Sequence, residues 1–212
     1  MADLLGCMGR GIFFVVIGYL SGSILFANLA IRLLNKKSFL QVSKDGNPGA
    51  ANAFRYGGIG CGLITLLGDL LKGFLPLYIY IQSGGEFTEH PFSAAIIFVA
   101  PVLGHAFSLF YGFQGGKGIA VTFGCLMGVW PITKPLILFI IFFLLFTVVF
   151  RIIPHFQRTM ITYIVTCFGL LVAHCEPGIV AGFMMTTVIV CIRLHMSKEE
   201  RQKIEVRLLW KH

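Results

Sequence analysis

Long apolar stretches alternate with short polar segments along most of the chain. A membrane-spanning helix needs about 20 apolar residues, and stretches of about this length recur. They predict about seven spans, at about 11–34, 57–81, 93–110, 118–133, 135–151, 159–174 and 177–193. The clearest one follows Lys134, where "PLILFIIFFLLFTVVF" carries no charge before Arg151. The span at 118–133 is the weakest, because it is short and glycines blur its start.

The chain has no series of alternating segments of about ten residues, which a membrane barrel would need. We therefore expect an all-α polytopic membrane protein in which residues 1–212 form a single domain. The composition agrees, since 57% of the 212 residues are hydrophobic and 12% are charged, against about 25% charged residues in a soluble domain. The first apolar run extends beyond the roughly 7–15 residues of a signal-peptide core, so we interpret it as a span.

Lysine and arginine residues predict the orientation. With seven spans, one face of the membrane carries the first, third and fifth loops and the C-terminal segment. These segments contain Arg32, Lys36, Lys37, Lys44, Arg55, Lys117, Arg151, Arg158, Arg193, Lys198, Arg201, Lys203, Arg207 and Lys211. The other face carries Arg10 and Lys134, and Lys72 lies within a span. Because positive residues concentrate in cytoplasmic loops, we expect an outside N-terminus and a cytoplasmic C-terminus.

The net charge of +8 is explained by this orientation and by attraction to anionic lipid, so no nucleic-acid partner is expected. The six cysteines include no C-x-x-C pair. Their spacing excludes a zinc framework, and we expect neither a metal nor another cofactor.

Two glycine-rich segments lie on the predicted cytoplasmic side, "DGNPGAANAFRYGG" at 45–58 and "GFQGGKG" at 112–118. Backbone N–H groups at the start of a helix attract an anion, and Lys117 would strengthen such a site. The alternative is a tight re-entrant bend whose glycines allow close helix packing. The second segment is not a Walker A loop, because Tyr111 occupies the first glycine position of that motif.

Polar residues inside the spans are further candidates. Asp69 and Lys72 are three residues apart on one helical face, so they can pair. Such a pair marks a functional cavity or serves as a neutralised structural pair. His105 is a candidate general base, although a lone histidine in a helix is more often a packing residue. Asn28 and Asn52 are candidate ligands or helix-packing groups.

Three of these motifs, with the opening "YLSGSILFA", closely resemble the acyl-phosphate–glycerol-3-phosphate acyltransferase family (PlsY). They are "DGNPGAANAFRYGG", "GDLLKGFLP" and "GHAFSLFYGFQGGKGIAVTFG", and the similarity runs over most of the chain in the same order. The resemblance implies a seven-helix enzyme of the bacterial plasma membrane.

The resemblance also implies a reaction. The family transfers an acyl group from acyl phosphate to the 1-hydroxyl of glycerol 3-phosphate, giving lysophosphatidic acid and phosphate for phospholipid synthesis. It needs no metal or nucleotide. Acyl phosphate, glycerol 3-phosphate and membrane lipid are therefore the expected partners, and the oligomeric state stays open, with a monomer as one option.

Matching the motifs residue by residue gives the candidate site. The resemblance implies catalytic roles for His105 and Lys117. Asp45, at the place of a functionally important serine of the family, is the third catalytic candidate, since a carboxylate could accept the proton of the attacking hydroxyl, although it would also repel phosphate. The resemblance implies substrate binding by Gly46, Asn47, Gly49, Asn52, Arg55, Asp69, Lys72, Gly115, Gly116, Gly118 and Ser197.

Three positions depart from the family pattern. Asp45 stands where the family usually has serine, and Gln114 stands where it often has lysine. In the C-terminal motif, Leu194 takes the histidine place and Ser197 the asparagine place. The phosphate-binding part is kept, while the surroundings of the acceptor hydroxyl are altered. A divergent acyltransferase with another acceptor is therefore an alternative, as is a non-catalytic lipid-phosphate-binding or transport protein.

Overall fold

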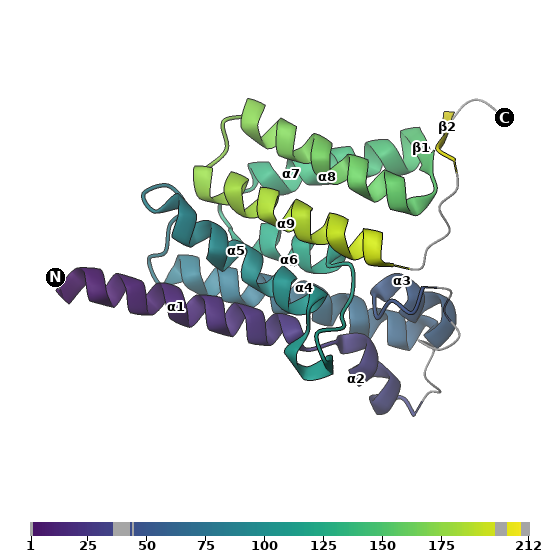
Figure 1. Ribbon diagram of the computed structural model, residues 1–212, viewed down its shortest axis with the longest axis horizontal. Helices are drawn as coiled ribbons and strands as arrows, with labels where there is room; N and C mark the ends of the chain where they lie inside the picture. The colour runs from purple at the N-terminus through teal and green to yellow at the C-terminus, as the bar shows by residue number, and fades with distance from the viewer. Residues whose placement is uncertain (1, 36–42, 44, 198–202, 209–212) are drawn as a thin grey trace.

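Long helices dominate the computed structural model, which describes residues 2–35, 43, 45–197 and 203–208 (Figure 1). The long helices are α1 (Ala2–Ser23), α4 (Gly58–Gln82), α5 (Pro91–Ala106), α8 (His155–Val172) and α9 (Pro177–Met196). The shorter elements are α2 (Phe26–Leu33), α3 (Ala50–Asn52), α6 (Ile119–Gly128), α7 (Lys134–Leu144), the π-helical turns η2 (Ala53–Gly57) and η4 (Leu145–Val149), and the 3-10 turn η3 (Leu109–Tyr111). The basic residues Lys36, Lys37, Lys44, Lys198, Arg201 and Lys211 lie outside the described residues.

Three helical segments in the described part of the chain are long and apolar enough to cross a membrane: Ala50–Gln82, Pro91–Tyr111 and Pro177–Met196. The bent pair of α1 and α2 makes a fourth if it is counted as one span. Helix α6 and the segment Lys134–Val149 are apolar but shorter. The mainly helical fold is confirmed, and the number of seven spans stays a prediction.

The first expected span is broken rather than continuous. Helices α1 and α2 meet at an angle of 45°, with Leu25 in an extended conformation between them. Just before the break, Ser23 Oγ donates to the carbonyl of Tyr19 at 2.9 Å, and Ser21 Oγ donates to the carbonyl of Gly18 at 3.1 Å. Serine hydroxyls that bond back to the preceding turn bend helices, and Gly-Ser pairs are common kink sites.

The break frees backbone carbonyls within an apolar environment, where an unsatisfied polar group is costly. The carbonyl of Ile24 accepts a hydrogen bond from Lys72 Nζ at 2.6 Å. The carbonyl of Ser23 accepts one from Ser108 Oγ at 2.5 Å. Side chains from α4 and from the segment after α5 therefore stabilise the broken span.

A short sheet corrects the expectation of an all-helical chain. Strand β1 (Phe150–Ile153) pairs antiparallel with β2 (Glu205–Leu208), with Phe150 opposite Leu208 and Ile153 opposite Glu205. The sequence showed no strand because each is four residues long and its partner lies about fifty residues away, so no local alternation marks the pair. The sheet lies at the end of the molecule where α8 begins (Figure 1).

An aromatic cluster supports the helix that begins behind the second glycine-rich segment. The rings of Tyr163 and Phe183 stack with centroids 5.5 Å apart, and Phe139 packs edge-on against both. The hydroxyl of Tyr163 donates to Thr122 Oγ1 at 3.0 Å, and Thr122 donates to the carbonyl of Gly118 at 2.9 Å. The start of α6 is thereby fixed from the core.

Glycines allow two pairs of helices to cross with their backbones in close approach. A Cβ added at Gly104 of α5 would collide with the carbonyl of Tyr19 in α1. A Cβ at Gly124 of α6 would collide with the carbonyl of Leu70 in α4. Small residues at helix crossings are typical of membrane proteins, where dispersion contacts drive helix association.

We predict that Gly124→Ala lowers the thermal unfolding temperature by several degrees, because the methyl group must push α4 and α6 apart. Overpacking of this kind costs about 1–3 kcal/mol. Gly11→Ala is the matched control, since a Cβ at Gly11 meets nothing within 4 Å. The measurement is thermal unfolding of both variants in the same detergent. Equal unfolding temperatures for the two variants would contradict the close crossing.

Candidate active site

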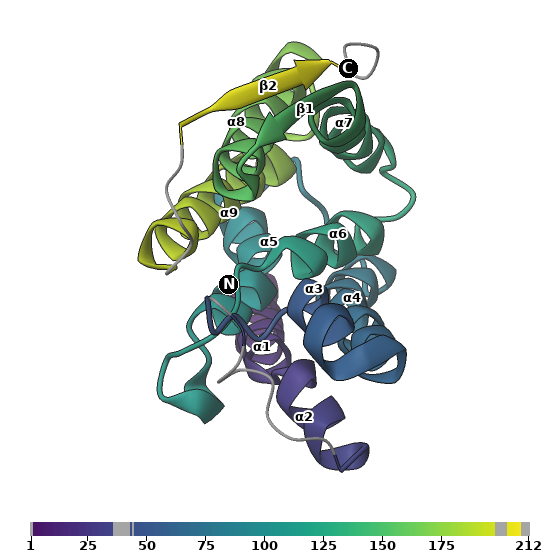
Figure 2. The same ribbon diagram turned by 90° about the vertical axis from the view of Figure 1, so that its right-hand side faces the viewer.

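A pocket of about 780 Å³ opens at the end of the molecule where α9 finishes. Figure 2 views the molecule from this end, with α3 and the last turn of α9 toward the viewer. Both glycine-rich segments contribute to the wall, through Asp45, Gly46, Asn47 and Pro48 on one side and Tyr111, Gln114, Gly115 and Lys117 on the other. Leu25, Asn28, Ser43, Arg193, Met196 and Ser197 complete the lining. Two segments about 70 residues apart in sequence therefore share one cavity.

An ion pair joins the two segments across the pocket. Lys117 Nζ lies 2.7 Å from Asp45 Oδ2, and the side chains are 8% and 10% exposed. The other carboxylate oxygen, Oδ1, accepts hydrogen bonds from Asn52 Nδ2 at 2.7 Å and from the backbone N–H of Asn47 at 3.3 Å. Asn52 also donates to the carbonyl of Asn47 at 2.9 Å. The carboxylate is thus held by donors on both of its oxygens.

These contacts decide the charge of Asp45. Burial raises the pKa of the carboxyl, but hydrogen bonds from Lys117 and Asn52 and the positive charge of Lys117 outweigh it, so the pKa lies below its ordinary value. At neutral pH Asp45 is therefore an anion within the pocket. It partly neutralises the lysine that the sequence assigns to phosphate binding.

The loop before α6 needs glycine for steric reasons. A Cβ at Gly115 would collide with the carbonyl of His105, and a Cβ at Gly116 would collide with the imidazole Nε2 of His105. Gly118 precedes α6 with a φ of +81°, in the left-handed region that favours glycine. This geometry directs the first backbone N–H groups of α6 toward the segment that carries Lys117, as an anion site at a helix start requires.

Asp69, Lys72 and His105 form a buried cluster behind this loop. Lys72 Nζ lies 2.8 Å from Asp69 Oδ1 and 2.8 Å from His105 Nδ1. The residues are 1%, 4% and 2% exposed, and none of them lines the pocket. The carbonyl of His105 accepts a hydrogen bond from the N–H of Gly116 at 3.0 Å. The cluster therefore holds the loop in place, and direct contact of these three residues with substrate stays a prediction.

Arg55 lies apart from the other candidates. It belongs to the π-helical turn η2, is exposed, and places its guanidinium 5.5 Å from the ring centroid of the neighbouring Tyr56. It does not line the pocket. A π-helical turn has more residues per turn than an α-helix, so it changes the direction in which the side chains at 53–57 point. The phosphate contact of Arg55 stays a prediction.

Gly49 and Ser197 complete the predicted site. A Cβ at Gly49 would lie 2.7 Å from the side-chain nitrogen of Asn47, so this glycine leaves room for Asn47 beside the carboxylate of Asp45. Ser197 lines the pocket at the C-terminal end of α9, and its hydroxyl donates to the carbonyl of Leu194 at 2.8 Å. Both residues help to shape the pocket.

The model of the glycerol-3-phosphate acyltransferase family matches residues 12–203 of the chain. The chain belongs to this family. Curated members named glycerol-3-phosphate acyltransferase from Escherichia coli strain K12 / DH10B and from Shigella boydii serotype 18 are 40% identical to it over 120 residues. The alignment covers 56% of this chain and 56% of each relative, so the match spans about half of their length.

Two solved structures resemble the structure of this chain over most of its length. Both are of PlsY (YgiH), described as an integral membrane glycerol 3-phosphate acyltransferase. The glycerol 3-phosphate form gives a TM-score of 0.72 at 26% identity, covering 88% of each chain. The lysophosphatidic acid form gives 0.69 at 26% identity, covering 86% of this chain and 87% of the other. The chain is therefore a multi-pass membrane protein of the acyltransferase family.

A charged residue of the pocket is missing from the sequence-based site. Arg193 lines the pocket, and an N–H of its guanidinium donates to the carbonyl of Gly115. The sequence counted Arg193 only among the charges that set orientation. Its place at the first, basic position of the family's C-terminal motif was the available signal. The turn of α9 that directs its side chain toward the loop was not visible in the sequence.

We predict that the Asp45–Lys117 ion pair stabilises the folded protein at neutral pH and loses this effect in acid. Since the folded pKa of Asp45 is lowered from 3.8, the contribution is complete above that value and disappears as the pH falls through the lowered pKa. Asp45→Asn should unfold at a lower temperature than the unmodified protein at pH 7, by an amount that shrinks toward pH 3.

Glu205→Gln is the control for this experiment. Glu205 pairs with Arg207 at 2.9 Å, but the side chains are 60% and 64% exposed. Exposed pairs contribute about 0–1 kcal/mol, so this change should have little effect at either pH. An Asp45→Asn effect that stays constant from pH 7 to pH 3 would show that the carboxylate charge is not its cause.

Proposed function

We propose that this chain transfers an acyl group from acyl phosphate to the 1-hydroxyl of glycerol 3-phosphate, giving lysophosphatidic acid and phosphate. The hydroxyl oxygen attacks the acyl carbonyl carbon, and the bond from that carbon to the phosphate oxygen breaks. Phosphate leaves with the electron pair, and the hydroxyl proton passes to a base. Because phosphate is already a good leaving group, no covalent enzyme intermediate is required, and the protein acts by positioning and charge stabilisation.

The observation that carries this proposal is the shared pocket of the two glycine-rich segments, joined by Asp45 and Lys117. Both proposed substrates contain a phosphoryl group. Lys117 and the N–H groups at the start of α6 form an anion site of the kind that binds phosphate. The names of the relatives and the glycerol 3-phosphate form of the similar structure support the same ligand chemistry.

Asp45 is the proposed base. Its carboxylate lines the pocket beside Lys117, where the acceptor hydroxyl would approach the acyl carbon. When a phosphoryl oxygen takes the ammonium of Lys117, the carboxylate loses its cation and becomes a better proton acceptor. His105 is proposed as a positioning residue for Gly116, since its ring lies behind the loop.

The acyl tail is proposed to leave the pocket along its apolar part toward lipid. Leu25 and Met196 line the pocket together with the charged residues. Large side chains on the outer faces of the helices, such as Phe168, which is 67% exposed, are suited to contact with lipid. The tail could then remain among apolar groups while the phosphate is held in the pocket.

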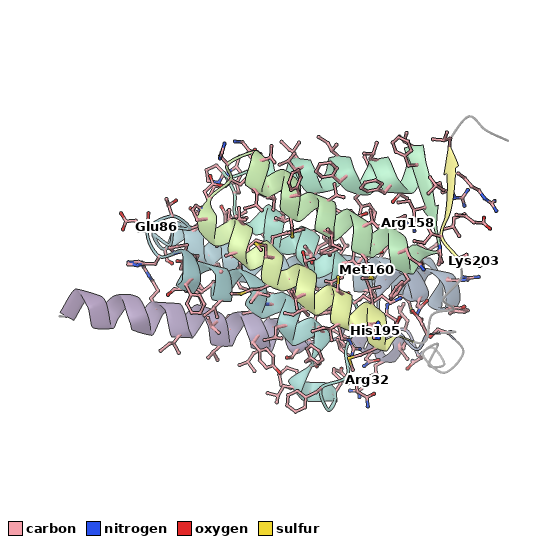
Figure 3. All side chains as sticks on the ribbon, turned by 45° about the horizontal axis from the view of Figure 1, so that its top comes forward. Arg32, Glu86, Arg158, Met160, His195 and Lys203 are labelled. Carbon is pink, nitrogen blue, oxygen red and sulfur yellow. The ribbon has the colours of Figure 1, made fainter. Side chains whose placement is uncertain are left out.

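The proposed orientation places the pocket on the cytoplasmic side of a bacterial plasma membrane. Figure 3 labels Arg32, Arg158, His195 and Lys203 toward the end of the bundle that carries the pocket, and Glu86 toward the other end. Positive residues concentrate on the cytoplasmic side. Soluble glycerol 3-phosphate would then reach the pocket from the cytoplasm. A single domain over residues 1–212 that acts as a monomer suffices for this scheme.

An acceptor other than glycerol 3-phosphate is the second candidate, and Asp45 is the observation that favours it. The carboxylate occupies Lys117 and would repel the phosphate of the acceptor. A carboxylate is well suited to accept hydrogen bonds from the hydroxyls of an uncharged polyol. The purified protein in lipid, given acyl phosphate with a panel of polyols and polyol phosphates, separates the two candidates by the mass of the product.

We predict that Lys117→Ala lowers kcat/KM for acyl transfer by at least about 100-fold while the protein stays folded, because the variant removes the charge at the proposed phosphate site. Lys134→Ala is the matched control, since Lys134 donates to the carbonyl of Ala173 at 3.1 Å and does not line the pocket. The assay follows phosphate release with both substrates present. Equal activity of the two variants would remove Lys117 from the mechanism.

We predict that Asp45→Ser lowers kcat for transfer to glycerol 3-phosphate by about 100-fold, which is the usual contribution of a general base. Asp45→Asn should lose as much, since an amide cannot accept the proton. The measurement is product formation over a range of acceptor concentrations. A higher rate for Asp45→Ser would reject the base and favour the second candidate.

A further inference from the structure

One face of the β1–β2 sheet carries only apolar side chains. Cross-strand partners lie on the same face of a sheet, and neighbours along a strand lie on opposite faces. The register therefore places four apolar residues together, and they are Phe150, Ile152, Val206 and Leu208. Ile152 is buried, whereas Val206 is 58% exposed and Phe150 is 39% exposed. The face is covered at Ile152 and open to its surroundings at Val206 and Phe150.

The opposite face of the sheet places two arginines side by side. Arg151 and Arg207 are both exposed and are direct partners in the register, and like charges in such positions destabilise a strand pair. Arg207 also pairs with Glu205, but this exposed ion pair contributes little. The guanidinium of Arg151 has no ion-pair partner among the described residues. An anion that contacts both guanidinium groups would remove their repulsion.

The surroundings of the sheet are positively charged. Lys203 precedes β2 and is exposed, and Glu205 is the acidic residue of the two strands. The cations Arg151, Arg207 and Lys203 therefore outweigh the carboxylate of Glu205. Figure 3 labels Lys203 and Arg158 toward the end of the molecule that carries the sheet, and Arg158 belongs to the first turns of α8. The charge of this surface is suited to an anionic partner.

The position of the sheet along the chain places it at a membrane boundary. The segment Lys134–Val149 is apolar, and β1 begins with the next residue, Phe150. Arg151 is the first charged residue after Lys134. Arginine side chains at the ends of apolar helices extend toward the layer of lipid headgroups. The charged face of the sheet therefore lies at the level of the lipid phosphates, and its apolar face can contact acyl chains.

We propose that the β1–β2 sheet binds an anionic phospholipid at the membrane surface. The guanidinium groups of Arg151 and Arg207 donate to oxygens of the lipid phosphate, since a guanidinium offers two parallel N–H groups to such an anion. Val206 and Phe150 contact the upper part of the acyl chains. The charged face selects an anionic lipid over a neutral one, and the apolar face selects a lipid over free phosphate. None of these residues lines the pocket, so the site is separate from it.

The test measures the Kd of two lipids for the full-length chain in detergent, by native mass spectrometry. The probes are phosphatidylglycerol and phosphatidylcholine with the same acyl chains. Arg151→Gln and Arg207→Gln should each weaken phosphatidylglycerol binding by about fivefold, the contribution of one basic residue near an anionic surface, and leave phosphatidylcholine binding within about twofold. Arg10→Gln is the matched control, because Arg10 donates to the carbonyl of Ser83 outside the sheet, and it should change neither Kd.

Thermal unfolding in nanodiscs separates lipid binding from a purely structural role of the two arginines. In phosphatidylcholine, the double variant Arg151→Gln/Arg207→Gln should unfold at the same temperature as the unmodified protein or higher, because two opposed like charges are removed. In phosphatidylglycerol the unmodified protein should be the more stable, because bound lipid stabilises the folded state. The same order in both lipids overturns the proposal, as does an equal loss of affinity for the two lipids.

Free phosphate is the other source of the same anion chemistry. Excess inorganic phosphate should leave phosphatidylglycerol bound at the sheet, and Val206→Ser should weaken the binding of both lipids. Displacement of the lipid by phosphate, or an unchanged affinity in Val206→Ser, overturns the assignment to a lipid. All of these measurements are made without acyl phosphate or glycerol 3-phosphate. A chain that fails to transfer acyl groups would therefore leave this inference standing.

Discussion

The buried ammonium of Lys72 is the interaction on which the pocket depends. It has three partners within 2.8 Å: the carboxylate of Asp69 as an ion pair, and the carbonyl of Ile24 and Nδ1 of His105 as hydrogen-bond acceptors. A charge at such depth is tolerated only when it is paired and hydrogen-bonded. Asp69 lies on the same helix, while Ile24 and His105 belong to distant parts of the chain, so one ammonium joins α4 to the break after α1 and to the end of α5.

His105 connects this buried cluster directly to the loop that carries Lys117. The carbonyl of His105 accepts from Gly116, and its ring leaves no room for a side chain at that residue. On the other side, Arg193 holds the carbonyl of Gly115. The loop that carries Lys117 is therefore clamped from α5 and from α9, and the hydroxyl of Tyr163 fixes the start of α6 through Thr122. Such support on helices keeps a binding loop in one conformation.

The sequence predicted the helical class and the two glycine-rich loops, because apolar length and glycine clusters are local signals. That both loops belong to one site followed from the predicted orientation and from the family resemblance. It could not predict what depends on partners distant in the chain. The break after Ser23 depends on donors from Lys72 and Ser108, and the β1–β2 pair joins segments about fifty residues apart. The outward direction of Arg55 follows from the π-helical turn η2, which changes the facing of side chains without any mark in composition.

The ion pair of Asp45 with Lys117 affects how the pocket binds an anionic ligand, and a serine at position 45 could not form this pair. Lys117 has an anionic partner within the protein, since its Nζ lies 2.7 Å from Asp45 Oδ2. A phosphoryl group must therefore displace the carboxylate of Asp45 from Lys117. The gain in electrostatic energy is then the difference between the lysine–phosphate and lysine–carboxylate ion pairs. This lowers affinity for any phosphate. It also places a freed carboxylate next to the arriving ligand, where an acceptor hydroxyl can use it. In the proposed mechanism, phosphate therefore binds less tightly, and Asp45 becomes available as a base once Lys117 has bound the phosphoryl group.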